Sequence, residues 1–212
     1  MSISNESRGR IKKIFEPIAL GMGRLGLTPD GLTLIGFGIT VVGAALLAAQ
    51  LWVIGGLVVF IGGVFDMFDG TLARATGKVS NLGAFMDSVF DRWGEAIVYL
   101  GIIAGAVFAG SDPVAVFAAA AMGAAFMVSY TRAKSEGLGF TAGTGMAAVG
   151  VMPREIRLVI LCIGLILAGA TANLTILVGA LAIITLGSTI TVIQRILHVR
   201  SQAKSAAAIT TH

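Results

Sequence analysis

The residues best suited to chemistry in this 212-residue chain are four aspartates that lie close together in the sequence. Two of them are three residues apart and the other two are four residues apart, so on helices each pair would share one face. Clustered carboxylates repel one another unless cations neutralise them. The spacing therefore predicts a cation site formed by Asp66, Asp69, Asp87 and Asp91.

The ligand type indicates which cation would bind. No Cys or His lies near the aspartates, and sites with only oxygen ligands favour Mg²⁺, Mn²⁺ or Ca²⁺ over zinc. Four carboxylates exceed what one Mg²⁺ needs, so we expect two ions that share ligands. Such a pair of ions clamps phosphate oxygens and stabilises charge during an in-line displacement. We therefore predict two Mg²⁺ ions as cofactors, with Mn²⁺ as the alternative ion.

Neighbouring residues fit a phosphorylated ligand. Gly70 follows an aspartate on an expected helix, where glycine costs about 1 kcal/mol relative to alanine, and its missing side chain would let a ligand approach. Gly83 does the same on the next helix, and Arg74 lies one turn beyond Gly70, in a place to bind phosphate. The competing interpretation is that the aspartates are capping charges at a helix turn. Two pairs of aspartates at helical spacing, together with two glycines and an arginine, favour a functional cation site over capping charges. Ionisable residues at membrane depth are functional candidates by default.

The composition is that of a membrane protein. Only 12% of the residues are charged and 56% are hydrophobic, with a mean hydropathy of +0.93, whereas soluble domains are about 25% charged. We predict an all-α membrane protein with a single domain over residues 1–212. Its expected parts are an interfacial arm at 1–30, a six-helix bundle at 31–199 and a polar tail at 200–212.

Long uncharged stretches mark the expected transmembrane helices, since about 20 apolar residues cross the hydrocarbon core. They predict six helices, at 32–50, 52–76, 81–109, 113–136, 153–169 and 174–198. A short link joins the second and third, so their facing ends would bring the four aspartates together. Before the first helix, Ile11 to Leu25 mixes basic and apolar residues, which predicts an amphipathic helix at the membrane surface. The alternative is a leader that only fixes orientation.

The charge distribution predicts the orientation. With this arrangement all 15 Lys and Arg fall on one side of the membrane, and Asp112 marks the other. The positive-inside rule then places both termini and the aspartates on the cytoplasmic side of the cell membrane. Residues 139–150, rich in Gly, Ala and Thr, are expected to form a cytoplasmic loop. The spacing Gly101-x3-Gly105 allows close helix approach. We expect it to serve a homodimer, with packing inside the chain as the alternative.

The segment from Asp66 to Asp91 reads D-x2-D-G-x2-A-R-x8-G-x3-D-x3-D. It resembles the signature of the CDP-alcohol phosphotransferase family at every fixed position. The resemblance implies a CDP-linked lipid donor, CDP-diacylglycerol, whose pyrophosphate bridges two metals and whose CMP leaves. It also implies that Asp66, Asp69 and Asp87 are metal ligands. Asp91 would contact the second metal and act as the general base on the acceptor hydroxyl.

Other positions match the family's donor site. The segment Thr28-Pro29-Asp30-Gly31-Leu32-Thr33 resembles the loop that helps to hold the nucleotide, and Ser80 matches a hydroxyl position near the cytidine. The alternative role of Asp30 is to begin a helix as its N-cap, and the two roles are compatible. The resemblance implies a CDP-lipid-binding set of Asp30, Gly31, Leu32, Thr33, Gly70, Arg74 and Ser80.

The acceptor is predicted from arginines outside the signature. Arg132, Arg154, Arg157 and Arg195 end three helices that should surround one cavity. Arginine suits bidentate phosphate recognition, so we expect a phosphorylated polyol; the alternative is that these cations only anchor headgroups. The pattern resembles the bacterial phosphatidylinositol-phosphate synthases. It departs from them at Pro153, where they have Glu, and at Glu155, which follows the first Arg of the motif.

Three functions follow for testing. The first is transfer of the phosphatidyl group from CDP-diacylglycerol to myo-inositol phosphate. The second is phosphatidylglycerophosphate synthesis with glycerol 3-phosphate as the acceptor. The third is transport of divalent cations, which is disfavoured because transporter carboxylates usually lie near the membrane midplane. No nucleic-acid partner is expected.

Overall fold

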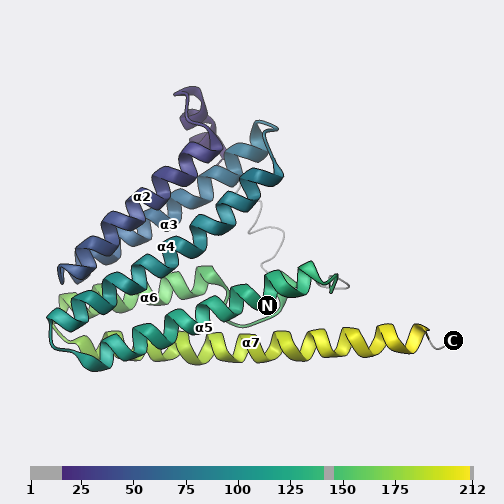
Figure 1. The fold of residues 1–212 in the computed structure, drawn as a ribbon. Helices are drawn as coiled ribbons and strands as arrows, with labels where there is room; N and C mark the ends of the chain where they lie inside the picture. The colour runs from purple at the N-terminus through teal and green to yellow at the C-terminus, as the bar shows by residue number, and fades with distance from the viewer. Residues whose placement is uncertain (1–15, 141–145, 211–212) are drawn as a thin grey trace.

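The computed structural model describes residues 16–140 and 146–210, and this part of the chain is helical, with no strand. After a short helical stretch at residues 16–24, six long helices and one short 3₁₀ helix follow (Figure 1). They are α2 (Pro29–Ala48), α3 (Trp52–Ala75), α4 (Asn81–Phe108), α5 (Asp112–Gly137), η1 (Met146–Ala148), α6 (Arg154–Ala170) and α7 (Leu174–Thr210).

The expected helices agree with α2–α7 to within three residues at every end except the C-terminal end of α7. That helix continues to Thr210, so the expected polar tail is helical as far as the structure describes it. The reason is that residues 199–210 contain no Gly or Pro to end a helix. Of the expected surface helix, residues 16–24 are helical, whereas 11–15 lie outside the described residues. Residues 141–145 of the expected loop also lie outside them.

The helices form two groups of three (Figure 1). Helix α2 packs on α3 and α4, and α7 packs on α5 and α6. The groups meet where α3 contacts α6 and where α4 turns into α5. From that turn they diverge toward the end of the molecule that carries the α3–α4 link.

Glycines allow the close approach of α4 to α2. A Cβ added at Gly101 would lie 2.4 Å from the carbonyl oxygen of Ala44, and one at Gly105 would lie 2.2 Å from that of Leu47. The glycine pair is therefore used inside the chain. This corrects the assignment of the pair to a dimer contact, because its close partner is the backbone of α2.

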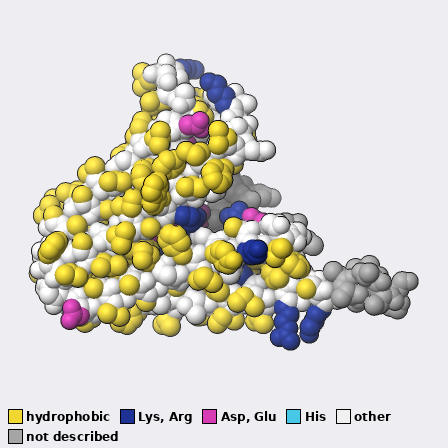
Figure 2. All heavy atoms as spheres, in the orientation of Figure 1, with side chains coloured by type: hydrophobic (Ala, Val, Ile, Leu, Met, Phe, Trp, Pro, Cys, Tyr) yellow, Lys and Arg dark blue, Asp and Glu magenta, His cyan; other side chains and the backbone are white. Residues whose placement is uncertain are grey.

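Within the part of the chain that the structure describes, four helices are long and apolar enough to cross a membrane: α2, α3, α5 and residues Leu174–Ser205 of α7. Helix α4 falls short because Asp87, Asp91, Arg92 and Glu95 lie among its first 15 residues, and α6 has only 17 residues and begins with charged ones. Hydrophobic side chains cover much of the visible outer surface (Figure 2). Many large apolar residues are exposed, and Leu34, Ile54, Ile163 and Leu186 are 52–65% exposed. Such a surface suits lipid rather than water. The protein is therefore a membrane protein.

Candidate metal and phosphate site

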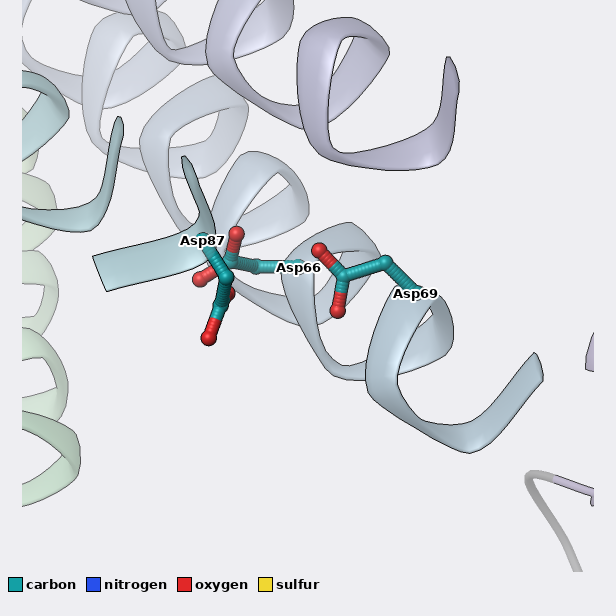
Figure 3. Close-up of side chains that lie close together, drawn as sticks. All are labelled: Asp66, Asp69 and Asp87. Atoms are coloured by element: carbon teal, nitrogen blue, oxygen red, sulfur yellow. The ribbon is translucent and has the colours of Figure 1, made fainter. Parts of the chain in front are cut away.

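The α3–α4 hairpin brings carboxylates from two helices together. Its link turns at Gly77, whose φ of +67° favours glycine, and Ser80 caps α4 by accepting a hydrogen bond from the amide of Gly83 at 2.9 Å. One carboxylate oxygen from each of Asp66, Asp69 and Asp87 lies within 4.8 Å of the others (Figure 3). This oxygen cluster fits a hard divalent cation such as Mg²⁺ or Mn²⁺.

Asp69 is held in place by two donors. The Thr33 hydroxyl on α2 donates to its Oδ2 at 2.6 Å, and the backbone amide of Gly70 donates to its Oδ1. Asp69 is also buried. The predicted donor-binding residue Thr33 therefore orients a predicted metal ligand, which a reading of either motif alone would not indicate.

Asp91 joins the cluster through an arginine. Nη1 of Arg154, the first residue of α6, lies 2.6 Å from Oδ2 of Asp66 and 2.6 Å from Oδ1 of Asp91. The other oxygen of Asp91 lies 3.6 Å from Arg92. The structure thus brings Asp66, Asp69 and Asp87 into one group and places Asp91 beside it, in contact with a predicted acceptor residue.

Arg157 lies deeper and makes a bidentate ion pair. Its Nε and Nη2 lie 2.8 and 2.9 Å from the two carboxylate oxygens of Glu95, and its Nη1 donates to the carbonyl oxygen of Met152 at 3.1 Å. Only 1% of Arg157 is exposed. Arg92 also pairs with Glu95, at 3.1 Å. Glu95 was not among the predicted site residues, although its position four residues after Asp91 places it on the same helical face.

The other two predicted acceptor arginines make contacts elsewhere. Arg195 is buried on α7, where its Nε donates to the carbonyl oxygen of Val149 at 3.0 Å and its Nη1 donates to that of Val128. It thereby braces α7 against α5 and against the connection to α6. Arg132 is half exposed and pairs with Glu136 one turn along α5, at 3.0 Å. Neither contacts the carboxylate cluster.

The predicted donor-binding residues gather at one end of the α2–α4 group. Oδ1 of Asp30 lies 3.5 Å from the point that a Cβ on Gly83 would occupy, and Arg74 folds over Gly70, with Nη1 3.2 Å from the corresponding point. Thr28, rather than Asp30, caps α2, by accepting from the amide of Gly31 at 3.1 Å. The alternative role of Asp30 as N-cap was therefore wrong. Leu32 is fully buried in a small cluster with Ala19, Phe68 and Leu72.

A small cavity of about 50 Å³ lies beside the carboxylates, between α2, α3, α4 and α6. Its polar lining includes Asp66, Glu95, Arg154 and Arg157, and its apolar lining includes Phe37 and Leu161. Figure 2 shows the two helix groups separated by a recess, with Lys or Arg side chains at its edge. The polar site therefore lies where the two groups face each other.

Comparison with known proteins identifies the family. A family model described as CDP-alcohol phosphatidyltransferase matches residues 26–198. The chain belongs to this family. The cation-transporter alternative loses its basis, because the match covers both groups of helices.

Relatives of known name agree with the family. An archaetidylinositol phosphate synthase of Pyrococcus horikoshii is 35% identical over 156 residues, which cover 74% of this chain and 78% of the relative. A phosphatidylinositol phosphate synthase of Mycobacteroides abscessus is 33% identical over 199 residues, covering 92% and 87%.

Solved structures are also similar. The phosphatidylinositol phosphate synthase of Mycobacterium tuberculosis with CDP-DAG bound matches with a TM-score of 0.78 and 30% identity, covering 88% of this chain and 94% of that one. The same enzyme in complex with manganese and citrate also has a TM-score of 0.78 and 30% identity, covering 87% and 88%. This chain is therefore a transferase of the family, with an acidic cluster suited to metal.

Proposed function

We propose that the chain transfers the phosphatidyl group of CDP-diacylglycerol to myo-inositol phosphate, giving phosphatidylinositol phosphate and CMP. The observation that carries the proposal is the contact of Arg154 with Asp91, since it puts a guanidinium group, suited to bind phosphate, beside the proposed general base. The names of the relatives support the acceptor, and the structure of a relative with CDP-DAG supports the donor.

The metals belong to the same proposal. Asp66, Asp69 and Asp87 would hold two Mg²⁺ ions, with Mn²⁺ as a substitute, and Asp91 would contact the second ion. Bound ions would supply neutralisation of the phosphate oxygens at the transition state. The oxygen-only cluster supports this assignment, as does the manganese in a relative. We expect EDTA to abolish turnover and added Mg²⁺ or Mn²⁺ to restore it; full turnover in excess chelator would contradict the assignment.

The chain's own residues would handle the substrates as follows. The nucleotide end of the donor would be bound by Asp30, Gly31, Gly70, Arg74 and Ser80. Thr33 would hold Asp69 in place, and Leu32 would pack against Ala19 in the N-terminal arm. Asp91 would take the proton from the acceptor hydroxyl while the oxygen of that hydroxyl bonds to the phosphatidyl phosphorus. The bond from that phosphorus to the bridging oxygen breaks, and CMP leaves with that oxygen.

Arg154 is the leading residue for the acceptor phosphate. It is 29% exposed in its side chain, whereas Arg157 is nearly fully buried in its pair with Glu95. Arg157 and Arg195 would then support the acceptor-phosphate site from its buried side, and Arg132 would lie toward the exposed edge of that site. Partial exposure of the side chain, 29% for Arg154 and 52% for Arg132, supports direct contact with substrate for these two of the four arginines.

We also propose six transmembrane helices in the cell membrane, with the site open to the cytoplasm. Helices α4 and α6 each pack between apolar helices, which would let their charged halves face protein instead of lipid. The clustering of Lys and Arg on one side supports the orientation. The expected homodimer stays a prediction that cross-linking in native membranes would test.

The acceptor is tested with purified protein, CDP-diacylglycerol and Mg²⁺. We expect CMP release with myo-inositol phosphate, and little with free myo-inositol or glycerol 3-phosphate. Faster release with glycerol 3-phosphate would make the enzyme a phosphatidylglycerophosphate synthase. Absence of CMP release with every phosphorylated polyol would refute the proposed function.

A further inference from the structure

One hydroxyl on α7 fastens the segment that leads into α6. Oγ1 of Thr191 accepts hydrogen bonds from the backbone amides of Val151 at 3.2 Å and Met152 at 3.0 Å. Its own proton is donated to the carbonyl oxygen of Gly187 at 2.9 Å. The residue is fully buried. Since a hydroxyl has one donor and two acceptor positions, Thr191 uses all of them here.

The shapes of the two partners match this contact. Gly150 has a φ of +124°, and a Cβ at this position would lie 2.2 Å from Cγ2 of Thr191. Met152 is buried with its side chain on Gly187, where a Cβ would lie 2.2 Å from Cε of Met152. We name the group Gly150, Met152, Gly187 and Thr191 the α7 clamp. It holds residues 150–152 against one turn of α7.

The clamp is directly connected to the reactive carboxylates. Pro153 follows Met152 and leads into α6, whose first residue, Arg154, contacts Asp66 and Asp91. The carbonyl oxygen of Met152 also accepts from Arg157. The start of α6 is thus fixed from two sides, by the Glu95–Arg157 pair toward α4 and by the clamp toward α7.

We propose that Thr191 is a positioning residue for the transfer reaction. By holding the amides of Val151 and Met152, it sets where Arg154 lies relative to Asp91, and so where the acceptor is held. The inference rests on the proposed function only in assigning the acceptor to Arg154. The donor-binding positions lie on α2, on α3 and in the α3–α4 link, away from the clamp, which reaches that side only through the contact of Arg154 with Asp66. The clamp should therefore act mainly on the acceptor.

Thr191→Val keeps the shape of the side chain and removes the hydroxyl. We expect it to raise the acceptor KM by about 10-fold, in line with the loss of a buried hydrogen-bond partner, and to change the donor KM much less. Thr191→Ser, which keeps the hydroxyl, should behave as the wild type. The matched control is Thr189→Val, because Thr189 is exposed on the same helix and its hydroxyl serves only its own helix.

A second variant approaches the clamp from the other side. Gly150→Ala leaves the Thr191 hydroxyl in place, but it adds a methyl group that would lie 2.2 Å from Cγ2 of Thr191, at a positive φ. It should show the same selective rise in acceptor KM. This keeps the proposal testable if Thr191→Val does not fold.

Hydrogen–deuterium exchange of residues 146–157 gives a readout independent of turnover. The Val151 and Met152 amides should exchange faster in Thr191→Val, and at the wild-type rate in Thr191→Ser and Thr189→Val. A wild type inactive with every acceptor would refute the proposed function. Hydrogen–deuterium exchange of the Val151 and Met152 amides would still show whether the Thr191 hydroxyl holds this segment. Unchanged exchange, or equal changes in both KM values with only a lower yield of folded protein, would overturn the positioning role.

Discussion

The charges around the acidic site do not balance within the protein. Asp66, Asp91 and Glu95 each contact a guanidinium group of Arg92, Arg154 or Arg157. Asp69 and Asp87 make no ion pair in the described part of the chain. The excess negative charge is thus concentrated on two of the three carboxylates that lie within 4.8 Å of one another. Bound divalent cations would remove that repulsion.

At the residue scale, Asp91→Asn tests the general base. The amide keeps the size of the side chain but cannot take a proton, so turnover should fall by at least about 10²-fold. Binding of CDP-diacylglycerol should persist, because the predicted donor positions lie on other residues. CMP release and donor binding are measured on the same preparation, with Asp112→Asn at the far end of the bundle as the control. A near-normal rate in Asp91→Asn would remove it from this role.

At the element scale, the start of α6 shows what the sequence could and could not predict. The spacing of Asp66, Asp69 and Asp87 on two helices joined by a short link was enough to place their carboxylates together, because helical periodicity and a hairpin are local features. The Glu95–Arg157 pair joins residues 62 positions apart. No local pattern signals such a pairing. The same is true of Arg195, whose partners are backbone carbonyls that sequence does not distinguish.

The Glu95–Arg157 pair should stabilise the fold as well as shape the site. Glu95→Ala leaves a buried guanidinium without its partner and should cost about 3–5 kcal/mol, whereas replacing both residues by apolar ones should recover most of that loss. Thermal unfolding in detergent of Glu95→Ala and of Glu95→Leu/Arg157→Met measures the difference. The matched control is Glu136→Ala, which breaks an exposed pair worth at most about 1 kcal/mol. Equal stability of Glu95→Ala and the wild type would show that the pair is dispensable.

At the scale of the whole molecule, the arrangement of helices explains why two of them do not look like membrane spans. Helix α4 contacts α2 and α5, and α6 contacts α3 and α7. Their charged ends pair with each other through Glu95 and Arg157 and through Asp91 and Arg154. Within the described residues, a criterion of helix length and composition therefore identifies four spans, two fewer than the six expected from the uncharged stretches. Such a criterion cannot tell a charge facing lipid from one paired inside the bundle.

The topology of α4 and α6 can be measured by labelling single cysteines in intact cells. The starting protein is Cys162→Ser, which removes the chain's one cysteine. Lys78, Asp112 and Thr171 are exposed and lie in or beside the links α3–α4, α4–α5 and α6–α7. If both helices span, an impermeant maleimide should label Asp112→Cys and Thr171→Cys from outside, and Lys78→Cys only after permeabilisation. Labelling of positions 78 and 112 from the same side would mean that α4 does not cross. Labelling of positions 112 and 171 from opposite sides would mean that only one of α5 and α6 crosses. The crossing helix would then be α5, because it is the longer of the two and meets the criteria for a span, and α6 would not cross.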